Sequence, residues 1–243
     1  MDTVTFETRT TRATGRRIDP MNSIDATRRV LRIGAAVVLS IGACAASSGR
    51  EAPAALPLEA ELTELLAQLP GRYEGPASGG RLYHKIVPIA APNFGEAAAF
   101  YHQISRDGFD SAAPFQQKIY VFDRDPARGS NRMRSWVFFP KQGYANLERD
   151  AAALRALQPA TLMNFPLECA IRWSRGDAPG RFVARVRRED CTYDSVAFEQ
   201  KISPDMTYVL DSVSFSIEDI LYGENGQPLF PSAGLLRAER QAR

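Results

Sequence analysis

The sequence predicts a mainly β protein, folded as a single antiparallel β-barrel with one or two short helices. Apolar residues recur at every second position through most of the chain after residue 80, as expected for strands. Turn-forming stretches separate these runs, and long helices do not alternate with them, which argues against a parallel α/β sheet. Many strands at short spacing are typical of an antiparallel barrel or a sandwich. Several runs carry large residues on both faces, and this favours the barrel, a curled sheet with a lined interior.

The expected helices are both short. Leucines at positions 58, 62, 65, 66 and 69 of "LEAELTELLAQL" fall on one face of a helix over 58–69, and Pro70-Gly71 ends it. A second helix is expected over 146–157, "NLERDAAALRAL", and Pro159 limits its C-terminal end.

The strand-like runs make up most of the remaining chain. Turn chemistry in "APNFG", "RDPARGSN", "RGDAPG" and "GENGQP" separates many of them. The expected strands cover 82–89, 98–105, 116–123, 131–139, 168–174, 181–188, 195–202, 206–219 and 235–240.

The first 57 residues are expected to lie outside this barrel. Residues 28–44, "RRVLRIGAAVVLSIGAC", combine a basic start, an apolar run and small residues before a cysteine, which is typical of a secretory signal peptide. The "SIGAC" end is typical of a bacterial lipobox with Cys44 lipidated, and a short apolar helix with a chance cysteine is the alternative. The expected parts are an extension and signal peptide (1–43), a lipidated cysteine with its tether (44–57) and the barrel domain (58–243).

Charge and predicted location exclude some partners. Cleavage before Cys44 removes seven arginines and four acidic residues from the 30 basic and 28 acidic residues of the chain, leaving 23 and 24. No basic excess then remains to bind nucleic acid or an anionic membrane surface. The expected location is the cell envelope, as a periplasm-facing lipoprotein of the outer membrane, in contact with the membrane through its lipid anchor only.

Two cysteines, Cys169 and Cys191, remain in the predicted mature chain. An even pair in an oxidising compartment favours a disulfide, and two buried thiols are the alternative. The bridge would close a loop of roughly 20 residues and contribute about 3 kcal/mol in the chain-entropy model. Two isolated cysteines without a nearby histidine make a poor zinc site, so no metal is expected.

The hairpin over 114–140 carries an unusual pattern. Each of its two runs has one basic residue followed by aromatic residues at every second position: Lys118, Tyr120 and Phe122, then Arg134, Trp136 and Phe138. If Phe122 pairs with Arg134, Tyr120 also faces Trp136, and all six side chains lie on one face. Such a face would suit a flat, conjugated ligand with carboxylates. The simpler interpretation is a half-exposed face on which Lys and Arg lie over aromatic rings.

The order of several short motifs resembles that of a known family. They are "LLAQLPGRY", "LYHKIVPI", "AFYHQIS", "PFQQKIYVF", "FPLECAIRW" and "GRFVARVRREDCTY". Over roughly residues 60–240 this order is similar to that of the T-type phycobiliprotein chromophore lyases, the CpcT/CpeT-like family. The family's opening motif is met by Leu69, Gly71 and Tyr73, and its paired cysteines match Cys169 and Cys191.

The resemblance implies a cup-shaped barrel, similar in outline to lipocalins, that binds a linear tetrapyrrole (a bilin) and passes it to a cysteine thiol of an acceptor protein. Lys118 and Arg134 would then bind the propionates, while Tyr120 and Trp136 pack on the rings. The ligand-binding residues expected from the pattern and the resemblance are Tyr101, His102, Gln103, Gln116, Lys118, Tyr120, Arg134 and Trp136.

The reaction class, a lyase that attaches a bilin to a cysteine, follows from the resemblance only. No catalytic residue is assigned and no cofactor is required, with the bilin as the candidate ligand. Two alternatives stay open on the same fold: a non-enzymatic lipoprotein that binds a small amphipathic molecule, and a structural component of the envelope.

Other chemistry has weaker support in the sequence. His84, inside a strand, is expected to be a structural histidine. The resemblance places His102 in the family's "YxEQ" segment, which implies that it lines a cavity and could donate a proton to a bound tetrapyrrole. There is no "GxSxG" elbow of a serine hydrolase. "DRDPARG" lacks the later ligands of a calcium loop, so Asp123 and Asp125 are expected to cap a turn.

Overall fold

The computed structural model describes residues 58–77, 79–95, 97–138, 144–196, 198–230, 232 and 234–242. The signal peptide, the lipidation of Cys44 and the tether therefore lie outside the described residues and stay predictions. Within the described part of the chain, no helix is long and apolar enough to cross a membrane.

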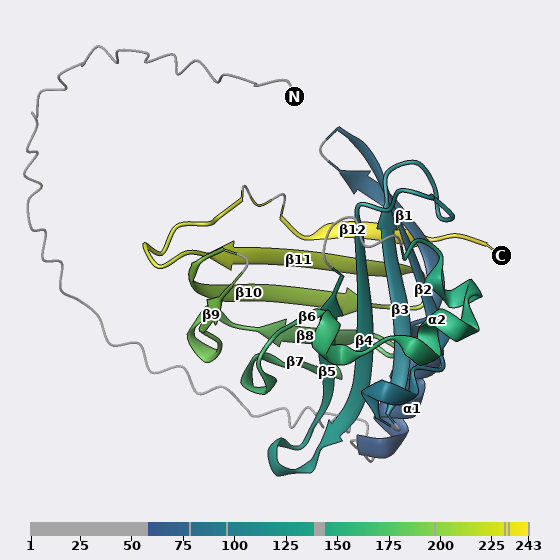
Figure 1. Cartoon of the computed structure of the whole chain (residues 1–243). Helices are drawn as coiled ribbons and strands as arrows, with labels where there is room; N and C mark the ends of the chain where they lie inside the picture. The colour runs from purple at the N-terminus through teal and green to yellow at the C-terminus, as the bar shows by residue number, and fades with distance from the viewer. Residues whose placement is uncertain are drawn as a thin grey trace, which may run out of the picture. The chain divides into compact units, whose positions relative to one another are not determined.

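Ten antiparallel strands close into a barrel, as predicted (Figure 1). In the order of pairing they run β11, β12, β1, β2, β3, β4, β5, β7, β8 and β10, and the pairing of β10 with β11 closes the ring. Their bounds are β1 Gly71–Ala77, β2 Gly80–Ile89, β3 Ala98–Ser105, β4 Gln116–Asp125, β5 Ser130–Val137, β7 Ile171–Arg175, β8 Phe182–Val186, β10 Gln200–Leu210, β11 Ser214–Tyr222 and β12 Leu236–Arg240.

Two very short strands lie outside this ring. Strand β6 (Met163–Asn164) pairs with the end of β5, and β9 (Tyr193–Ser195) pairs with the start of β10. Each is attached to the barrel along one edge.

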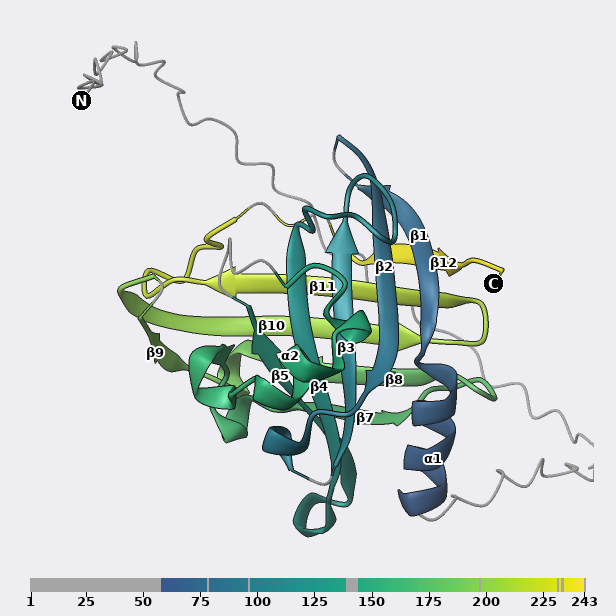
Figure 2. The ribbon, with the colours of Figure 1, turned by 45° about the vertical axis from the view of Figure 1, so that its right-hand side comes forward.

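Both helices were expected, and they cover different parts of the barrel (Figure 2). Helix α1 (Leu58–Gln68) directs Leu65 and then Leu69 into the barrel core, and Gln68 Nε2 donates to Gly180 O at 2.7 Å. Helix α2 (Ala151–Ala156) is shorter than the predicted 146–157. It begins after Asp150, whose carboxylate accepts from two backbone N–H groups and caps the helix.

Two predicted strands were wrong in their bounds. The run 206–219 is a hairpin, because Asp211 accepts hydrogen bonds from the backbone N–H of Val213 (2.9 Å) and Ser214 (2.7 Å) and turns the chain. The run 195–202 spans the end of β9 and the start of β10, with Glu199 at a φ of 52° between them.

Strand β1 was not predicted, because "GRYEGPA" contains two glycines and a proline. The structure shows why one of these glycines, Gly75, is needed. A Cβ at Gly75 would lie 2.5 Å from the carbonyl oxygen of Arg237, so glycine allows β12 to approach β1 closely and close the barrel.

The apolar residues form two layers. The larger lies inside the barrel and contains fully buried aromatic side chains, among them Trp173, Tyr73 and Phe215. The smaller lies on the outer side of β3, β4 and β5, where α2 covers Ile119, Val121 and Trp136. The inward and outward faces of β4 are therefore both buried, by different partners.

Candidate functional site

The predicted pairing of β4 with β5 was wrong by one residue. Tyr120 faces Ser135 and Ile119 faces Trp136, so the inward face of β4 lies beside Met133, Ser135 and Val137. The cause is the loop of four residues between the paired Asp125 and Ser130. It begins with Pro126, which cannot donate to the ladder, and ends with Gly129 at a φ of 57°.

This register divides the eight predicted ligand residues between two faces. His102, Lys118 and Tyr120 point into the barrel, and Gln116 shares their face by strand alternation. The other four lie on the outer side: Tyr101, Gln103, Arg134 and Trp136. The expected single wall of two cations and two aromatic rings does not exist.

Arg134 and Trp136 fit the simpler interpretation of the pattern. The Arg134 guanidinium carbon lies 5.1 Å from the Trp136 ring centroid, and Phe94 meets the same ring edge-on at 5.1 Å. Arg134 also lies 3.7 Å from an Asp123 carboxylate oxygen. Both side chains therefore stabilise the outer layer, through a cation–π contact and packing.

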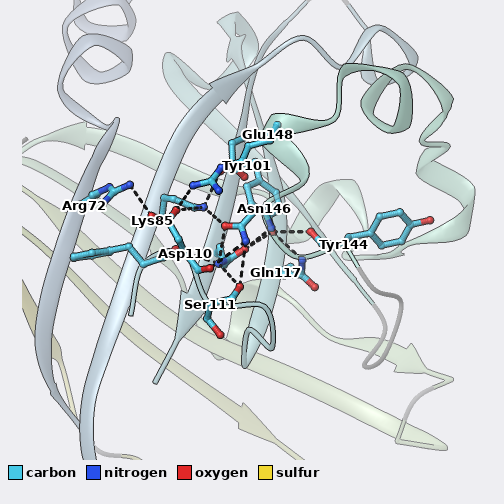
Figure 3. Close-up of polar contacts among 12 residues, drawn as sticks. Arg72, Lys85, Tyr101, Asp110, Ser111, Gln117, Tyr144, Asn146 and Glu148 are labelled. Atoms are coloured by element: carbon cyan, nitrogen blue, oxygen red, sulfur yellow. Dashed lines mark hydrogen bonds and ion pairs between the residues drawn. The ribbon is translucent and has the colours of Figure 1, made fainter. Parts of the chain in front are cut away.

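Tyr101 and Gln103 belong to a polar network on the outer wall. Figure 3 shows Tyr101 of this network with Lys85 and Asn146. The Gln103 Oε1 atom accepts from the Tyr101 hydroxyl and from the backbone N–H of Asn146, both at 2.8 Å. Lys85, almost fully buried, donates to Asp110 at 3.1 Å and Glu148 at 2.7 Å in the same network. These contacts attach two loops to β2 and β3.

The inward residues form a polar cluster inside the aromatic core, which we call the interior cluster. His84 Nδ1 lies 3.1 Å from His102 Nε2, and His102 Nδ1 lies 2.8 Å from the Tyr120 hydroxyl. Lys118 Nζ donates to Asp219 Oδ2 at 3.2 Å. The members of the cluster are His84, His102, Tyr120, Tyr208, Lys118 and Asp219.

Burial keeps most of this cluster uncharged. It lowers the pKa of His84 to about 4, with the Lys118 cation as the second cause. The pKa of His102 is lowered well below its usual value for the same reason, with His84 and Lys118 adding to it. Burial also raises the pKa of Tyr120 to about 12.

Lys118 is the cation of this cluster. Its residue is 4% exposed, and burial alone would lower its pKa, yet the Asp219 carboxylate reverses this and raises the pKa above the ordinary value. Asp219 itself keeps 29% of its side chain exposed. The ion pair therefore marks the point where the barrel interior reaches solvent.

A cleft of about 790 Å³ opens at the two short strands β6 and β9. Its lining is mainly apolar and comes from β6, β9 and their flanks: Met163, Asn164, Pro166, Tyr193, Asp194, Ser195 and Val196. The predicted disulfide joins Cys169 to Cys191 next to it, with a sequence separation of 22.

Sequence reasoning missed three parts of the site. Tyr208 and Asp219 come from β10 and β11, whose hairpin was read as one strand. His84 was taken as structural, and its hydrogen-bonding distance to His102 appears only once β2 and β3 are paired. No group of three or more His, Cys, Asp or Glu side chains within the described ranges is arranged to hold a metal ion.

Comparison with known proteins shows a likeness to a solved structure. No family model and no curated protein matches the chain. A solved structure of the CRL protein of Arabidopsis, in its selenomethionine form, matches with a TM-score of 0.55 at 12% identity. The match covers 77% of this chain and 100% of that one. At this identity the likeness shows a shared fold alone.

Proposed function

We propose that this protein binds a small amphipathic ligand that carries a carboxylate, with a linear tetrapyrrole as the model ligand, in the manner of the chromophore lyases that its motifs resemble. The observation that carries the proposal is Lys118, a buried cation that points into the barrel, with one carboxylate partner at the solvent boundary. A ligand carboxylate can replace or join Asp219 there, in a low-dielectric setting that strengthens the contact.

The surroundings of Lys118 fit a flat, conjugated molecule. Tyr120 and His102 lie on the same inward face, and their rings are 5.3 Å apart. The cleft of about 790 Å³ falls within the range of typical small-molecule sites, roughly 300–1,000 Å³. Its apolar lining suits rings rather than charged groups.

Transfer to a thiol is the second step of the proposal. Addition of an S–H group across a carbon–carbon double bond of the ligand forms one S–C and one C–H bond, and it needs no oxidant. The described cysteines are joined to each other, so a partner protein would supply the thiol. The barrel would hold the ligand in shape and leave the acceptor cysteine as nucleophile.

The proposed location follows from residues 28–44. The protein would be anchored to the envelope by the lipidated Cys44 and would act outside the cytoplasm. Incorporation of a clickable fatty acid that is lost in Cys44→Ser would support this location, and equal labelling of both proteins would contradict it.

A titration of the full chain with biliverdin, followed by visible absorbance, tests the binding. Loss of a charge-assisted hydrogen bond of roughly 1.5–3 kcal/mol predicts that Lys118→Met weakens binding by about 10-fold or more. Lys118→Arg should retain most of the affinity. Arg134→Met is the matched control, because Arg134 faces outward, and it should change the affinity less than about twofold.

A second candidate function has its own support. The barrel interior is filled by large aromatic side chains, including Trp173, Tyr208 and Phe122, as expected for a structural envelope component. Absence of biliverdin binding by the folded wild-type protein at tens of micromolar would favour this candidate and overturn the first.

A further inference from the structure

The barrel wall between β5 and β10 is built from different strands at its two ends. Near Asn131–Met133, β5 pairs with β7, and near Met206–Leu210, β10 pairs with β8. Strands β7 and β8 also pair with each other, so this part of the wall is continuous. At the C-terminal end of β5 its partner is β6, and at the N-terminal end of β10 its partner is β9. Strands β6 and β9 share no pairing in the described chain, so the wall is open between them. We call this opening the slit.

The slit passes through the wall rather than along its surface. Met163 pairs with Val137, whose side chain points inward, and Asn164 pairs with Trp136, whose side chain points outward. Paired residues share a face, so Met163 faces the interior and Asn164 the outside. On the other lip, Tyr193 is level with the buried Ile202, while Asp194 is exposed. The cleft touches both kinds of residue. Its inner surface is therefore mainly apolar, and its outer rim carries the polar Asn164 and Asp194 beside the exposed Val196.

Covalent and aromatic contacts connect the two lips. The disulfide joins Cys169, in the connection from β6 to β7, to Cys191, in the connection from β8 to β9. The Phe165 ring meets the Tyr193 ring edge-on with centroids 5.6 Å apart. These contacts restrict movement of the lips, so the slit exists before any ligand arrives.

The slit and the interior cluster are neighbours. Lys118 pairs with Val137, which pairs with Met163. Two strand spacings place the Lys118 and Met163 backbones about 10 Å apart, and both side chains point inward. Charge is also ordered across the wall, with Asp194 on the exposed rim and Lys118 inside. An anionic ligand would turn a carboxylate inward, where it replaces or joins Asp219 beside Lys118.

We propose that the slit between β6 and β9 seats the apolar ring system of the ligand, which lies across the barrel wall with its carboxylate at Lys118. The identity of the ligand rests on the proposed function above. Whether the slit holds flat apolar rings does not depend on that identity. The ligand and the slit are therefore tested separately.

The test uses the full chain with Cys44→Ser, which leaves an introduced thiol as the single free cysteine beside the Cys169–Cys191 bridge. Asn164→Cys on the outer rim is labelled with pyrene maleimide. Val213→Cys is the matched control, because Val213 is exposed in the turn between β10 and β11, remote in the topology from β6 and β9. Iodide quenching of pyrene and the Kd for biliverdin are measured for both.

We expect pyrene at position 164 to enter the slit and be quenched at least threefold less efficiently than at position 213. Labelling should also raise the Kd for biliverdin at least tenfold over that of the unlabelled Asn164→Cys protein, whereas labelling of Val213→Cys should change the Kd by less than about twofold. Equal quenching at the two positions would overturn the inference.

Two other outcomes separate the inference from the proposed function. Shielded pyrene at position 164 with undiminished biliverdin binding would overturn the slit as the ligand's seat and leave the proposed function standing. Shielded pyrene in a protein that never binds biliverdin would overturn the proposed ligand and support the slit as a site for apolar rings.

Discussion

At the scale of single residues, burial inside the barrel decides which form of each ionisable group is stable. His84 and His102 lie together in the core beside Lys118, and neither has a carboxylate as its hydrogen-bonding partner in the described contacts. Protonation of either ring would bring a second positive charge next to Lys118 without water to solvate it. The pair therefore stabilises the fold only in its neutral form.

The neutral state of His84 makes the stability of the folded protein depend on pH. The pKa of His84 is about 4 in the folded protein, below its ordinary 6.5, so the unfolded chain binds more protons between these values. Stability should fall as the pH drops from about 6.5 to 4, by roughly 3 kcal/mol for this group, and level off below. Urea unfolding at pH 7.5 and 4.5 measures the change.

His84→Phe is the control for that experiment, because it keeps a ring against Phe215 and removes one titrating group. Its stability should depend less on pH than that of the wild type. Equal pH dependence of both proteins would contradict the assignment. Asp110 and Asp211, whose pKa values are lowered from 3.8, titrate below this window.

The outer network allows a matched comparison of two cations that share carboxylates. The side chains of Lys85 and Arg149 both contact Asp110 and Glu148, but that of Lys85 is 3% exposed and that of Arg149 is 61% exposed. Lys85→Met removes the buried cation and leaves Glu148, whose side chain is 15% exposed, with only the longer 3.6 Å contact to Arg149, so it should lower the free energy of unfolding by about 3 kcal/mol or more. Arg149→Met should lower it by under about 1 kcal/mol. Similar losses in chemical denaturation would contradict the burial argument.

At the scale of elements, the disulfide substitutes for strand pairing. Strands β6 and β9 are too short to hold their connections in place, and the bridge between Cys169 and Cys191 ties those connections together. A separation of 22 residues corresponds to a contribution of about 3 kcal/mol in the chain-entropy model.

The double variant Cys169→Ala/Cys191→Ala tests this role. We expect it to fold and to lose about 3 kcal/mol in urea unfolding. Addition of a reductant should lower the stability of the wild type towards that of the variant and leave the variant unchanged. A variant as stable as the oxidised wild type would show that packing alone holds the slit.

At the scale of the whole molecule, the last strand completes the barrel. Strand β12 pairs with both β1 and β11. Arg240 adds hydrogen bonds from its guanidinium to the carbonyl oxygen of Pro70 at 2.7 Å and to the Tyr73 hydroxyl at 2.6 Å. Strand β12 thus joins the two ends of the sheet.

Deletion of residues 236–243 should therefore abolish cooperative unfolding, because it exposes the edges of β1 and β11 at once. Near-UV circular dichroism and thermal unfolding measure the loss. Arg240→Ala in the full chain is the milder control and should keep a cooperative transition at a lower Tm. A truncated protein with a cooperative transition would contradict the closing role of β12.

The sequence by itself determined the features that depend on neighbours along the chain. The leucine spacing of 58–69 gave helix α1, and apolar alternation placed most of the strands, because both periods are local properties of the backbone. The class of fold, the presence of two short helices and the pairing of the two cysteines followed from these patterns and from composition.

Only the tertiary structure decided which side chains share a face. The four-residue loop between β4 and β5 sets a register in which Arg134 and Trp136 lie on the outer wall. A change of register by one residue would move every side chain of the strand to the opposite face. Lys118 meets Asp219 across 101 residues of sequence. Such contacts arise when the barrel closes and fixes strands that are distant in the chain, so the interior cluster and the slit could not be read from local patterns.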